Sequence, residues 1–513
     1  MHQVFNASSY LLDRRLEAGD GDRIAVTGPR GTLTYQGLYE LTTHIAAGLA
    51  EIGVRPEQRV VLFTVDSPNM MATILAAMRI GAIPVPVSTM LTPQDLAGLV
   101  RDARATALVI SPEFADSFLP ALTDAPDLRH RIVEGSQHWQ QLLTTGQVAD
   151  PYPTWEDSAG LWLYTSGTTG LPKAAIHRHA NVRVVCETYG RQVLGIRPDD
   201  LVLSVPKMFF AYGLGTTMLF PLSVGASAVL EPARSTPDTV TARLRESHPT
   251  IFVATPTFFA AMLNTSVPED ALKGVRLATS AGEPLPAPIY ERFADRYGVQ
   301  IIDGLGSTEA LHIFISNRPG AVTPGTSGTP VPGYRVRIVD DNGENVPSGV
   351  EGHLLLAGDS IAMGYWCRYE TTRRVFQGEW LRTGDFYVAS DDGTYTYLGR
   401  SDDMIKSSGL WVSPAEVEAQ LLKHADVALA AVVAVPDESG LDKTVASVVR
   451  QPSSTVSADE LIAFCRDGIA HFKCPRTIVF VDELPLTATG KLRRNVIRVQ
   501  AADLIAAVRT GGE

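Results

Sequence analysis

The sequence predicts an α/β protein with a large N-terminal domain, residues 1–400, and a small α+β C-terminal domain, residues 401–513. Apolar strand-like segments alternate with helical periodicity before residue 310, which favours mainly parallel sheets with helices on their faces. Asp/Gly turns at residues 341–343 and 391–393 separate later strands, which favours a small antiparallel, barrel-like part. A chain of 513 residues is also too long for a single ordinary hydrophobic core, which favours two or more domains.

The first elements follow from capping and periodicity. Residues 23–27 form a strand, Thr34 caps a helix with apolar residues at helical spacing, and Gly53 ends that helix. The same patterns predict strands at residues 59–65, 82–87 and 107–111, and helices at residues 69–80 and 93–103. The Met- and Ala-rich composition of residues 69–80 indicates core packing.

Later segments continue the alternation. The predicted strands are residues 160–163, 201–206, 251–255, 275–280 and 299–303, with a helix near residues 258–263. The uncharged run 208–230 contains glycines and a proline, so we interpret it as buried loop, helix and strand rather than a membrane span. In the C-terminal domain we expect helices at residues 414–423 and 459–470, and strands at residues 429–435, 445–449 and 478–481. The glycine-rich end is expected to fray.

The amino-acid composition limits the classes of molecule that the protein is expected to bind. A net charge of −12 disfavours nucleic acid and anionic membranes. The four cysteines show no disulfide spacing and no secretory signal precedes them, which favours a cytoplasmic location. His177 and His179 lack the spacing of a zinc site.

The stretch from Tyr164 to Lys173 is rich in small polar residues. Its glycines allow close backbone approach, its hydroxyls are donors, and its lysine adds charge, so it suits a polyphosphate. The residues concerned are Thr165, Ser166, Gly167, Thr168, Thr169, Gly170 and Lys173. A flexible surface loop is the plainer interpretation. The glycine spacing does not match a Walker loop, which disfavours a P-loop kinase.

Other candidates follow strands or turns. Ala281-Gly282-Glu283 and the Gly304–Glu309 run come after two predicted strands, and both are expected to be turns facing one crevice. Glu309 could bind Mg²⁺ through its carboxylate, or it could be a first-turn glutamate that a helix dipole favours. Asp385 with Arg400 suits ribose hydroxyls, or caps a turn. Lys491 reaches a crevice, or belongs to a basic surface patch with Arg493 and Arg494. His312 among apolar neighbours suggests a core histidine.

Together these motifs resemble the adenylate-forming superfamily of acyl- and aryl-CoA synthetases, adenylation domains and luciferases. The motifs are residues 164–173, 304–309, 380–385, 399–406 and 489–491, in the family's order. Residues 84–93, 207–215, 306–317 and 409–414 resemble benzoate-CoA ligases most. Thr216, where Asn is common, and Ser407-Ser408 depart from that pattern.

The resemblance implies roles in binding ATP and Mg²⁺. The 165–170 segment and Lys173 would wrap the β- and γ-phosphates, Thr308 would contact the α-phosphate, and Glu309 would bind Mg²⁺. Asp385, assisted by Arg400, would hold the ribose. The residues lining the adenine and aryl sites would be Ala281, Gly282, Glu283, Asp303, Gly304, Leu305, Gly306 and Ser307.

The resemblance also implies the second substrate and a hinge. Asp402 would be the hinge of the C-terminal domain, and Lys491 would bridge the substrate carboxylate and phosphate. Coenzyme A would enter near Ser408, Gly409 and Trp411. The aryl carboxylate would contact Phe210, Ala211, Tyr212, Gly306 and His312.

The implied activity is an aryl-CoA ligase that forms an aryl adenylate from ATP and then a thioester, releasing AMP and pyrophosphate. One alternative is a stand-alone enzyme that loads a carrier protein, and another is a non-catalytic nucleotide-binding regulator. The oligomeric state, monomer or homodimer, is not set by the sequence.

Overall fold

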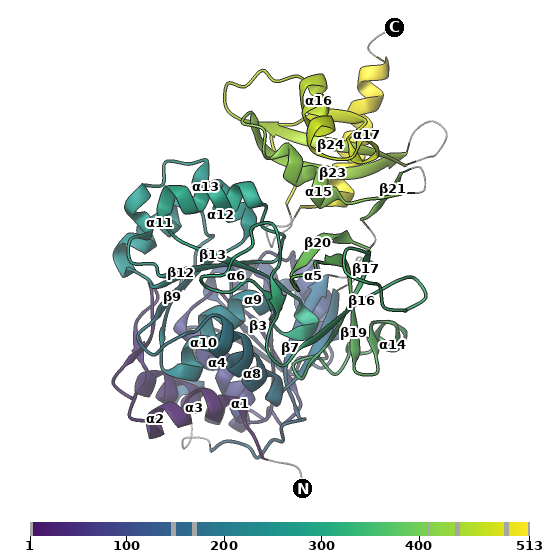
Figure 1. Cartoon of the computed structure of the whole chain (residues 1–513). Helices are drawn as coiled ribbons and strands as arrows, with labels where there is room; N and C mark the ends of the chain where they lie inside the picture. Colours follow the sequence, from purple (N-terminus) through teal and green to yellow (C-terminus); the bar gives the residue numbers. More distant parts are fainter. Residues whose placement is uncertain are drawn as a thin grey trace.

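The structure, a computed structural model, describes residues 4–144, 150–166, 172–401, 403–407, 410–436, 442–486 and 492–510. A large N-terminal body carries a smaller C-terminal body (Figure 1). This arrangement confirms the predicted α/β class. The proposed boundary after residue 400 falls at the end of strand β20, Tyr395–Arg400, and stays a prediction.

The largest sheet has nine strands. Their spatial order is β15 (Thr329–Pro330), β14 (Ile313–Ser316), β13 (Ile301–Gly306), β12 (Leu277–Ala281), β11 (Ile251–Ala254), β9 (Leu201–Ser204), β10 (Ser227–Val229), β1 (Ile24–Thr27) and β2 (Leu33–Thr34). The central strands are parallel, whereas β14, β15 and β2 add antiparallel edges.

Both faces of this sheet are covered, which explains its continuous apolar strands. Phe252 and Ala254 of β11 pack in one cluster, while Ile251 and Val253 of the same strand pack in another. The first cluster contains residues of three helices on one side of the sheet (Figure 1), α11 (Pro237–Ser247), α12 (Pro256–Leu263) and α13 (Ala287–Tyr297).

A second sheet is wholly parallel. It orders β4 (Ile83–Pro86), β3 (Arg59–Phe63), β5 (Ala107–Ile110) and β6 (His130–Val133). The helices of this region are α3 (Tyr35–Glu51), α4 (Pro68–Arg79), α5 (Pro93–Asp102), α6 (Pro112–Phe118) and α7 (Gln137–Thr144). The predicted Thr34 cap is confirmed, because its side chain accepts from the Gly37 N–H.

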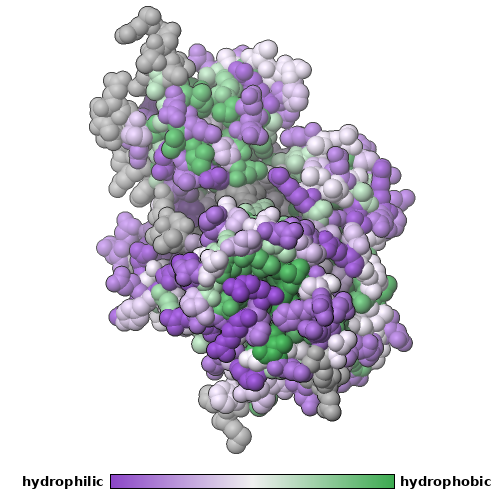
Figure 2. All heavy atoms as spheres, turned by 180° about the vertical axis from the view of Figure 1, so that it is seen from behind, coloured by the Kyte–Doolittle hydropathy of each residue, from purple (hydrophilic) through white to green (hydrophobic). Residues whose placement is uncertain are grey.

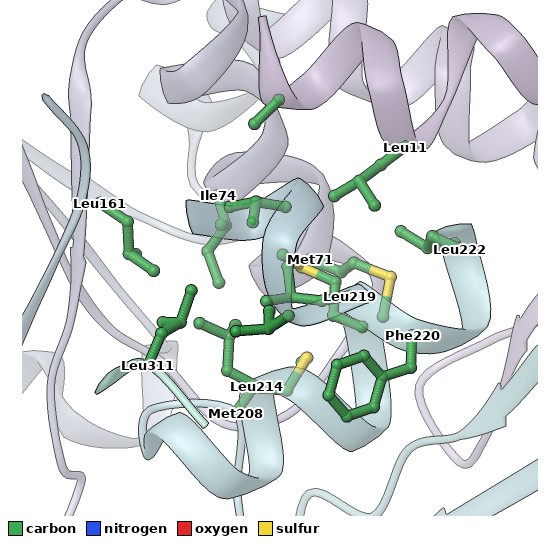
Figure 3. Close-up of a cluster of buried hydrophobic side chains, with 14 of the residues drawn as sticks. Leu11, Met71, Ile74, Leu161, Met208, Leu214, Leu219, Phe220, Leu222 and Leu311 are labelled. Atoms are coloured by element: carbon green, nitrogen blue, oxygen red, sulfur yellow. The ribbon is translucent and has the colours of Figure 1, made fainter. Parts of the chain in front are cut away.

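The Met- and Ala-rich helix α4 lies in the core, as predicted. Met71 and Ile74 are fully buried. Figure 3 places them against Leu219, Phe220 and Leu311, so α4 supports the segments that carry the later motifs. The uncharged run contains α9 (Ala211–Leu214), a π-helical turn (Gly215–Leu219), α10 (Phe220–Val224) and β10, which confirms its buried interpretation.

The remaining helices of the N-terminal body are short. They are α1 (Ala7–Leu11), α2 (Asp13–Glu17), α8 (His179–Val185), a π-helix (Cys186–Val193), α14 (Tyr369–Val375) and 3-10 turns at Leu119–Asp124, Glu269–Leu272 and Thr308–Ala310. No helix in the described ranges has the length and apolarity to cross a bilayer.

Figure 2 shows hydrophobic atoms gathered in a patch on the larger body, framed by hydrophilic ones.

Antiparallel pairing dominates after residue 334. Strands β16 (Arg335–Val339), β17 (Glu351–Ala357), β19 (Trp380–Ala389), β18 (Phe376–Gln377) and β20 form one sheet. A separate hairpin pairs β7 (Ala159–Ser166) with β8 (Pro172–Arg178). The strand before the small-residue stretch therefore returns on itself and does not join the nine-stranded sheet.

The C-terminal body is α+β, as predicted. Its elements are β21 (Ile405–Ser407), β22 (Leu410–Val412), α15 (Pro414–Leu421), β23 (Val427–Pro436), β24 (Asp442–Arg450), α16 (Ala458–Gly468), a 3-10 turn (His471–Lys473), β25 (Thr477–Phe480) and α17 (Arg494–Thr510). Helix α17 was not predicted. Its Ile497 and Ala501 pack against β23 and β24.

One predicted turn is wrong. Gly304, Leu305 and Gly306 continue β13 and pair with the antiparallel strand β14. Glycine permits this close pairing: a Cβ at Gly304 would lie 2.7 Å from Ile313 Cγ2, and one at Gly306 would lie 2.9 Å from the His312 carbonyl oxygen. The strand therefore carries the backbone up to Ser307, before the short turn with Glu309.

Glu134, directly after β6, provides a test of burial. Its side chain accepts from Ser111 Oγ at 2.9 Å, and burial raises its pKa to about 7. Because the folded pKa exceeds the unfolded one, the carboxyl's contribution to stability is present below about pH 4.5 and lost as pH rises through 7. We therefore expect the free energy of unfolding of Glu134→Gln, relative to that of the wild type, to rise by on the order of 2 kcal/mol from pH 5 to pH 8. Urea denaturation at the two pH values measures this difference.

The control is Glu246→Gln, whose side chain is 69% exposed and pairs with Arg243 on α11, away from Glu134. Its stability relative to wild type should be nearly the same at both pH values. A Glu134→Gln difference that does not change with pH would contradict the assignment of a neutral buried carboxyl.

Candidate active site

The β7–β8 hairpin places Lys173 opposite Thr165. The Lys173 Nζ atom lies 4.3 Å from the ring centroid of Tyr365, a cation–π contact. Burial lowers the pKa of Lys173, while the nearby Glu309 carboxylate opposes that shift. The intervening Gly167, Thr168, Thr169 and Gly170, and the side chain of Ser166, lie outside the described residues.

Tyr365 joins this lysine to Glu309. Its hydroxyl donates to Glu309 Oε1 at 2.6 Å, and burial together with that carboxylate raises the pKa of the tyrosine. Tyr365 was missed in the sequence, where Gly364-Tyr365-Trp366 carries no obvious chemistry. Its backbone forms a bridge with Ala175, so it lies alongside β8.

The Glu309 carboxylate fits a magnesium ion. Mg²⁺ prefers oxygen ligands and often takes one or two protein carboxylates together with phosphate oxygens. The described contacts engage only Oε1, and the partly buried side chain lies beside the Lys173 ammonium, which attracts phosphate. Glu309 lies in the first turn of a three-residue 3-10 helix, Thr308–Ala310. So short a helix has only a small dipole, which favours the metal-binding interpretation over the helix-dipole one.

Asp385 and Arg400 are cross-strand partners on β19 and β20. Arg400 Nη1 donates to Asp385 Oδ1 at 2.8 Å, which raises the pKa of the guanidinium. The aspartate side chain is 8% exposed and the arginine 44%, so the pair has one buried and one accessible member. The charge of Glu309 also acts on Arg400, which places this pair beside the lysine–tyrosine–glutamate group.

The two glycine-containing segments after β12 and in β13 are neighbours, because Ala281 pairs with Gly304. Burial raises the pKa of Asp303 to about 8. Thr257 Oγ1 donates to Glu283 Oε2 at 2.6 Å, which ties the segment after β12 to the start of α12. The predicted residues therefore lie together at the carboxyl ends of the neighbouring strands β12 and β13. They are Ala281, Gly282, Glu283, Asp303, Gly304, Leu305, Gly306 and Ser307.

Two of the expected aryl residues, Tyr212 and His312, are in contact. The rings of Tyr212 and His312 are 5.6 Å apart, and His312 Nε2 lies 3.3 Å from the Tyr212 carbonyl oxygen. Burial lowers the pKa of His312 to about 3, so the ring is neutral. Phe210, Ala211 and Gly306 are partly buried nearby in the chain. His312 is thus both a core histidine and a neighbour of Tyr212.

Two hydroxyl residues near this group were missed. Thr279 Oγ1 lies 2.9 Å from the Tyr189 hydroxyl and 3.3 Å from the Tyr212 hydroxyl. Thr216, the unusual residue of the sequence, is buried, and its hydroxyl donates to the Tyr212 carbonyl oxygen at 2.9 Å. No local motif identifies Tyr189 or Thr279, because strand pairing and a distant π-helix bring them together.

Several candidates lie outside the described residues, namely Asp402, Ser408, Gly409, Lys491 and the side chain of Trp411. The flanks of the Lys491 segment are described. Leu486 and Leu492 form an antiparallel bridge, and Arg494 makes two bonds to Glu418 at 2.6 and 3.0 Å. Arg494 is therefore a structural ion-pair residue, and its assignment to a basic surface patch is wrong.

Known proteins share this whole architecture. Residues 12–366 match the AMP-binding enzyme family and residues 416–491 match the AMP-binding enzyme C-terminal domain. The chain is 42% identical to benzoate–CoA ligase of Thauera aromatica, over 96% of each chain. It is 41% identical to 4-hydroxybenzoate–CoA/benzoate–CoA ligase of Rhodopseudomonas palustris, over 96% of this chain and 94% of the relative.

A solved structure agrees with the fold over almost all of the chain. The anthranilate CoA ligase AuaEII, crystallised with anthranoyl-AMP, superposes with a TM-score of 0.94 at 36% identity, over 99% of each chain. The family match covers both bodies, and the relatives are similar along nearly their full length. The resemblance seen in the sequence is thereby confirmed: the chain belongs to the AMP-binding enzyme family.

Proposed function

We propose that this protein is an AMP-forming aryl-CoA ligase that activates benzoate or a substituted benzoate with ATP and passes the aryl group to coenzyme A. The observation that carries the proposal is the convergence of Lys173 and Glu309 on Tyr365, with the Asp385–Arg400 pair beside them. Cations and a carboxylate so arranged suit a nucleotide polyphosphate. The similarity to benzoate-CoA ligases supports the aryl substrate.

In the first step a carboxylate oxygen of the aryl acid attacks the α-phosphorus of ATP. The new bond is carboxyl oxygen to phosphorus, the bond to the β-phosphate oxygen breaks, and pyrophosphate leaves with the electron pair. Lys173 binds the departing phosphates, Thr308 contacts the α-phosphate, and Lys491 bridges the carboxylate and phosphate. Mg²⁺, held by Glu309, would neutralise phosphate charge. Positioning and charge neutralisation supply most of the acceleration.

In the second step the thiol of coenzyme A loses its proton to solvent, and the thiolate attacks the activated carbonyl carbon. The bond between that carbon and the phosphate oxygen breaks, so AMP leaves and the thioester remains. Asp385 with Arg400 holds the ribose of the nucleotide through both steps. Asp402 provides the hinge between the steps, and Ser408, Gly409 and Trp411 border the path of the thiol.

The aryl acid lies against the group of Phe210, Ala211, Tyr212, Gly306 and His312. A neutral His312 adds no positive charge next to the ring, which suits an apolar aromatic substrate. The Thr279 hydroxyl and the hydroxyls of Tyr189 and Tyr212 give one end of this group a polar character. We infer that a small polar ring substituent is accepted there.

A substrate panel tests this function. Pyrophosphate release should be fastest with benzoate, hydroxybenzoates or aminobenzoates, slower with cinnamate, and slowest with octanoate. Coenzyme A and a phosphopantetheinylated carrier protein are compared as acceptors, and coenzyme A should give the faster thioester formation. Best activity with octanoate would refute the aryl assignment, and preference for the carrier would refute the ligase assignment.

A further inference from the structure

The turn that carries Thr308 and Glu309 is held by its backbone. Three successive carbonyl oxygens each accept a hydrogen bond from the surrounding structure. His177 Nε2 lies 2.8 Å from the Thr308 oxygen, the Ala362 N–H donates to the Glu309 oxygen at 2.8 Å, and Ser360 Oγ donates to the Ala310 oxygen at 2.6 Å. Hydrogen bonds from three other segments therefore hold all three carbonyl groups in place.

The partners of His177 define its proton. Arg178 Nε donates to Asn181 Oδ1 at 3.0 Å, which fixes the orientation of that amide, because an arginine has only donors. The Asn181 Nδ2 group then faces His177 Nδ1 at 3.0 Å and the Ser360 carbonyl oxygen at 2.8 Å. With Nδ1 as the acceptor, the ring proton is on Nε2 and points to Thr308. Burial lowers the pKa of His177 to about 4, so the ring stays neutral near pH 7.

The turn needs such support because it ends in an unfavourable conformation. Leu311 has φ = 66°, a left-handed value that is uncommon for residues other than glycine. Backbone of this kind persists where surrounding contacts hold it. Leu311 is fully buried in the cluster of Figure 3, so packing holds the end of the turn. The carbonyl contacts hold the three residues before it.

Strand β8 connects the turn with the phosphate-binding lysine. Residues 173, 175 and 177 alternate along the strand and share one face. Lys173 at one end contacts Tyr365, Ala175 pairs with Tyr365, and His177 at the other end contacts Thr308. One strand face thus sets the distance between the lysine and the turn.

We propose that His177 and Ser360 are positioning residues for adenylate formation, which place the side chains of Thr308 and Glu309 by holding the carbonyls of their turn. The inference rests on the roles of Thr308 and Glu309 given under the proposed function. Neither residue touches the reacting atoms. Their effect should appear in the Mg²⁺ and ATP dependence of the first step and not in the second.

The test compares His177→Leu with His177→Gln. His177→Leu should lower kcat for adenylate formation by about 10- to 100-fold, the scale expected for a misplacement of about 1 Å. The Mg²⁺ concentration for half-maximal rate should rise, and calorimetric affinity for a non-hydrolysable Mg²⁺–ATP analogue should fall. Thioester formation from supplied benzoyl adenylate should stay within about 2-fold by the same reasoning. His177→Gln, which keeps a donor, should restore most of the loss.

The matched control is His179→Leu. His179 is equally buried, and its pKa is also lowered to about 4, but its Nδ1 accepts from the Ala7 N–H at 3.1 Å. This variant should lower Tm and leave the Mg²⁺ dependence unchanged. If His177→Leu and His179→Leu lose adenylate formation in proportion to their loss of Tm, the positioning role is overturned.

Ser360→Ala decides the matter if His177→Leu does not fold. The Ser360 hydroxyl lies 2.6 Å from the Tyr334 hydroxyl and donates to the turn, so its removal should raise the Mg²⁺ requirement in the same way. Glu309→Gln separates the two proposals. Full adenylate formation by Glu309→Gln would refute the role of Glu309, and with it the positioning role, while the ligase function would stand. Its loss together with unchanged His177→Leu and Ser360→Ala would refute only the positioning role. A wild-type protein that forms no adenylate from any aryl acid would refute the proposed function.

Discussion

Glu309→Gln is expected to slow adenylate formation by at least about 100-fold, the usual scale for removing one charge-stabilising group from an active site. The amide oxygen can still accept from the Tyr365 hydroxyl, which lies 2.6 Å from the carboxylate, so the local structure should be retained. What is lost is the negative charge that a magnesium ion requires. The half-reaction is measured by ATP–pyrophosphate exchange over a range of Mg²⁺ concentrations.

Two further variants separate charge from hydrogen bonding. Tyr365→Phe keeps the carboxylate and removes its donor, so it should reduce the exchange rate less than Glu309→Gln does. Glu246→Gln alters a carboxylate that is 69% exposed and pairs with Arg243 on α11, and it should leave exchange unchanged. A Glu309→Gln enzyme with normal exchange and normal Mg²⁺ dependence would remove the magnesium assignment.

The sequence predicted most of the parallel strands because they are short apolar runs. It missed β6, in which His130 and Arg131 interrupt the apolar pattern. It failed where pairing comes from a distant segment. Gly304 and Gly306 look like turn residues in isolation, and only the antiparallel strand β14 makes them part of a strand. Helix α17 follows a basic segment whose Arg494 looks exposed until Glu418 is placed beside it.

The candidate site divides in the same way. Lys173, Glu309, Asp385 and Arg400 were found because each follows a glycine- or hydroxyl-rich motif. Tyr365 was not, because its role depends on a bridge to Ala175, 190 positions away in the chain. Residues that act directly on a ligand leave local patterns, whereas residues that hold them in place depend on contacts between segments far apart in the sequence.

Lys491→Ala should abolish adenylate formation and spare thioester formation from supplied benzoyl adenylate. The ammonium is required where a carboxylate and a phosphate, both anionic, approach each other. The second step joins a thiolate to an already neutral acyl carbon and has no such pair to bridge. Quenched-flow measurement of each half-reaction, with benzoate and ATP or with benzoyl adenylate and coenzyme A, distinguishes the two. Equal loss of both steps would refute this division.

The surroundings of Lys491 supply the control for this experiment. The bridge between Leu486 and Leu492 closes the segment at its base, and the Arg494–Glu418 pair anchors the chain that follows. Arg493 is exposed between these two anchors. Arg493→Ala removes a neighbouring cation without touching either anchor, so it should leave both half-reactions within about 2-fold, as expected for an exposed charge. A loss that matched Lys491→Ala would mean that the general positive charge of this segment, and not one placed ammonium, assists the first step.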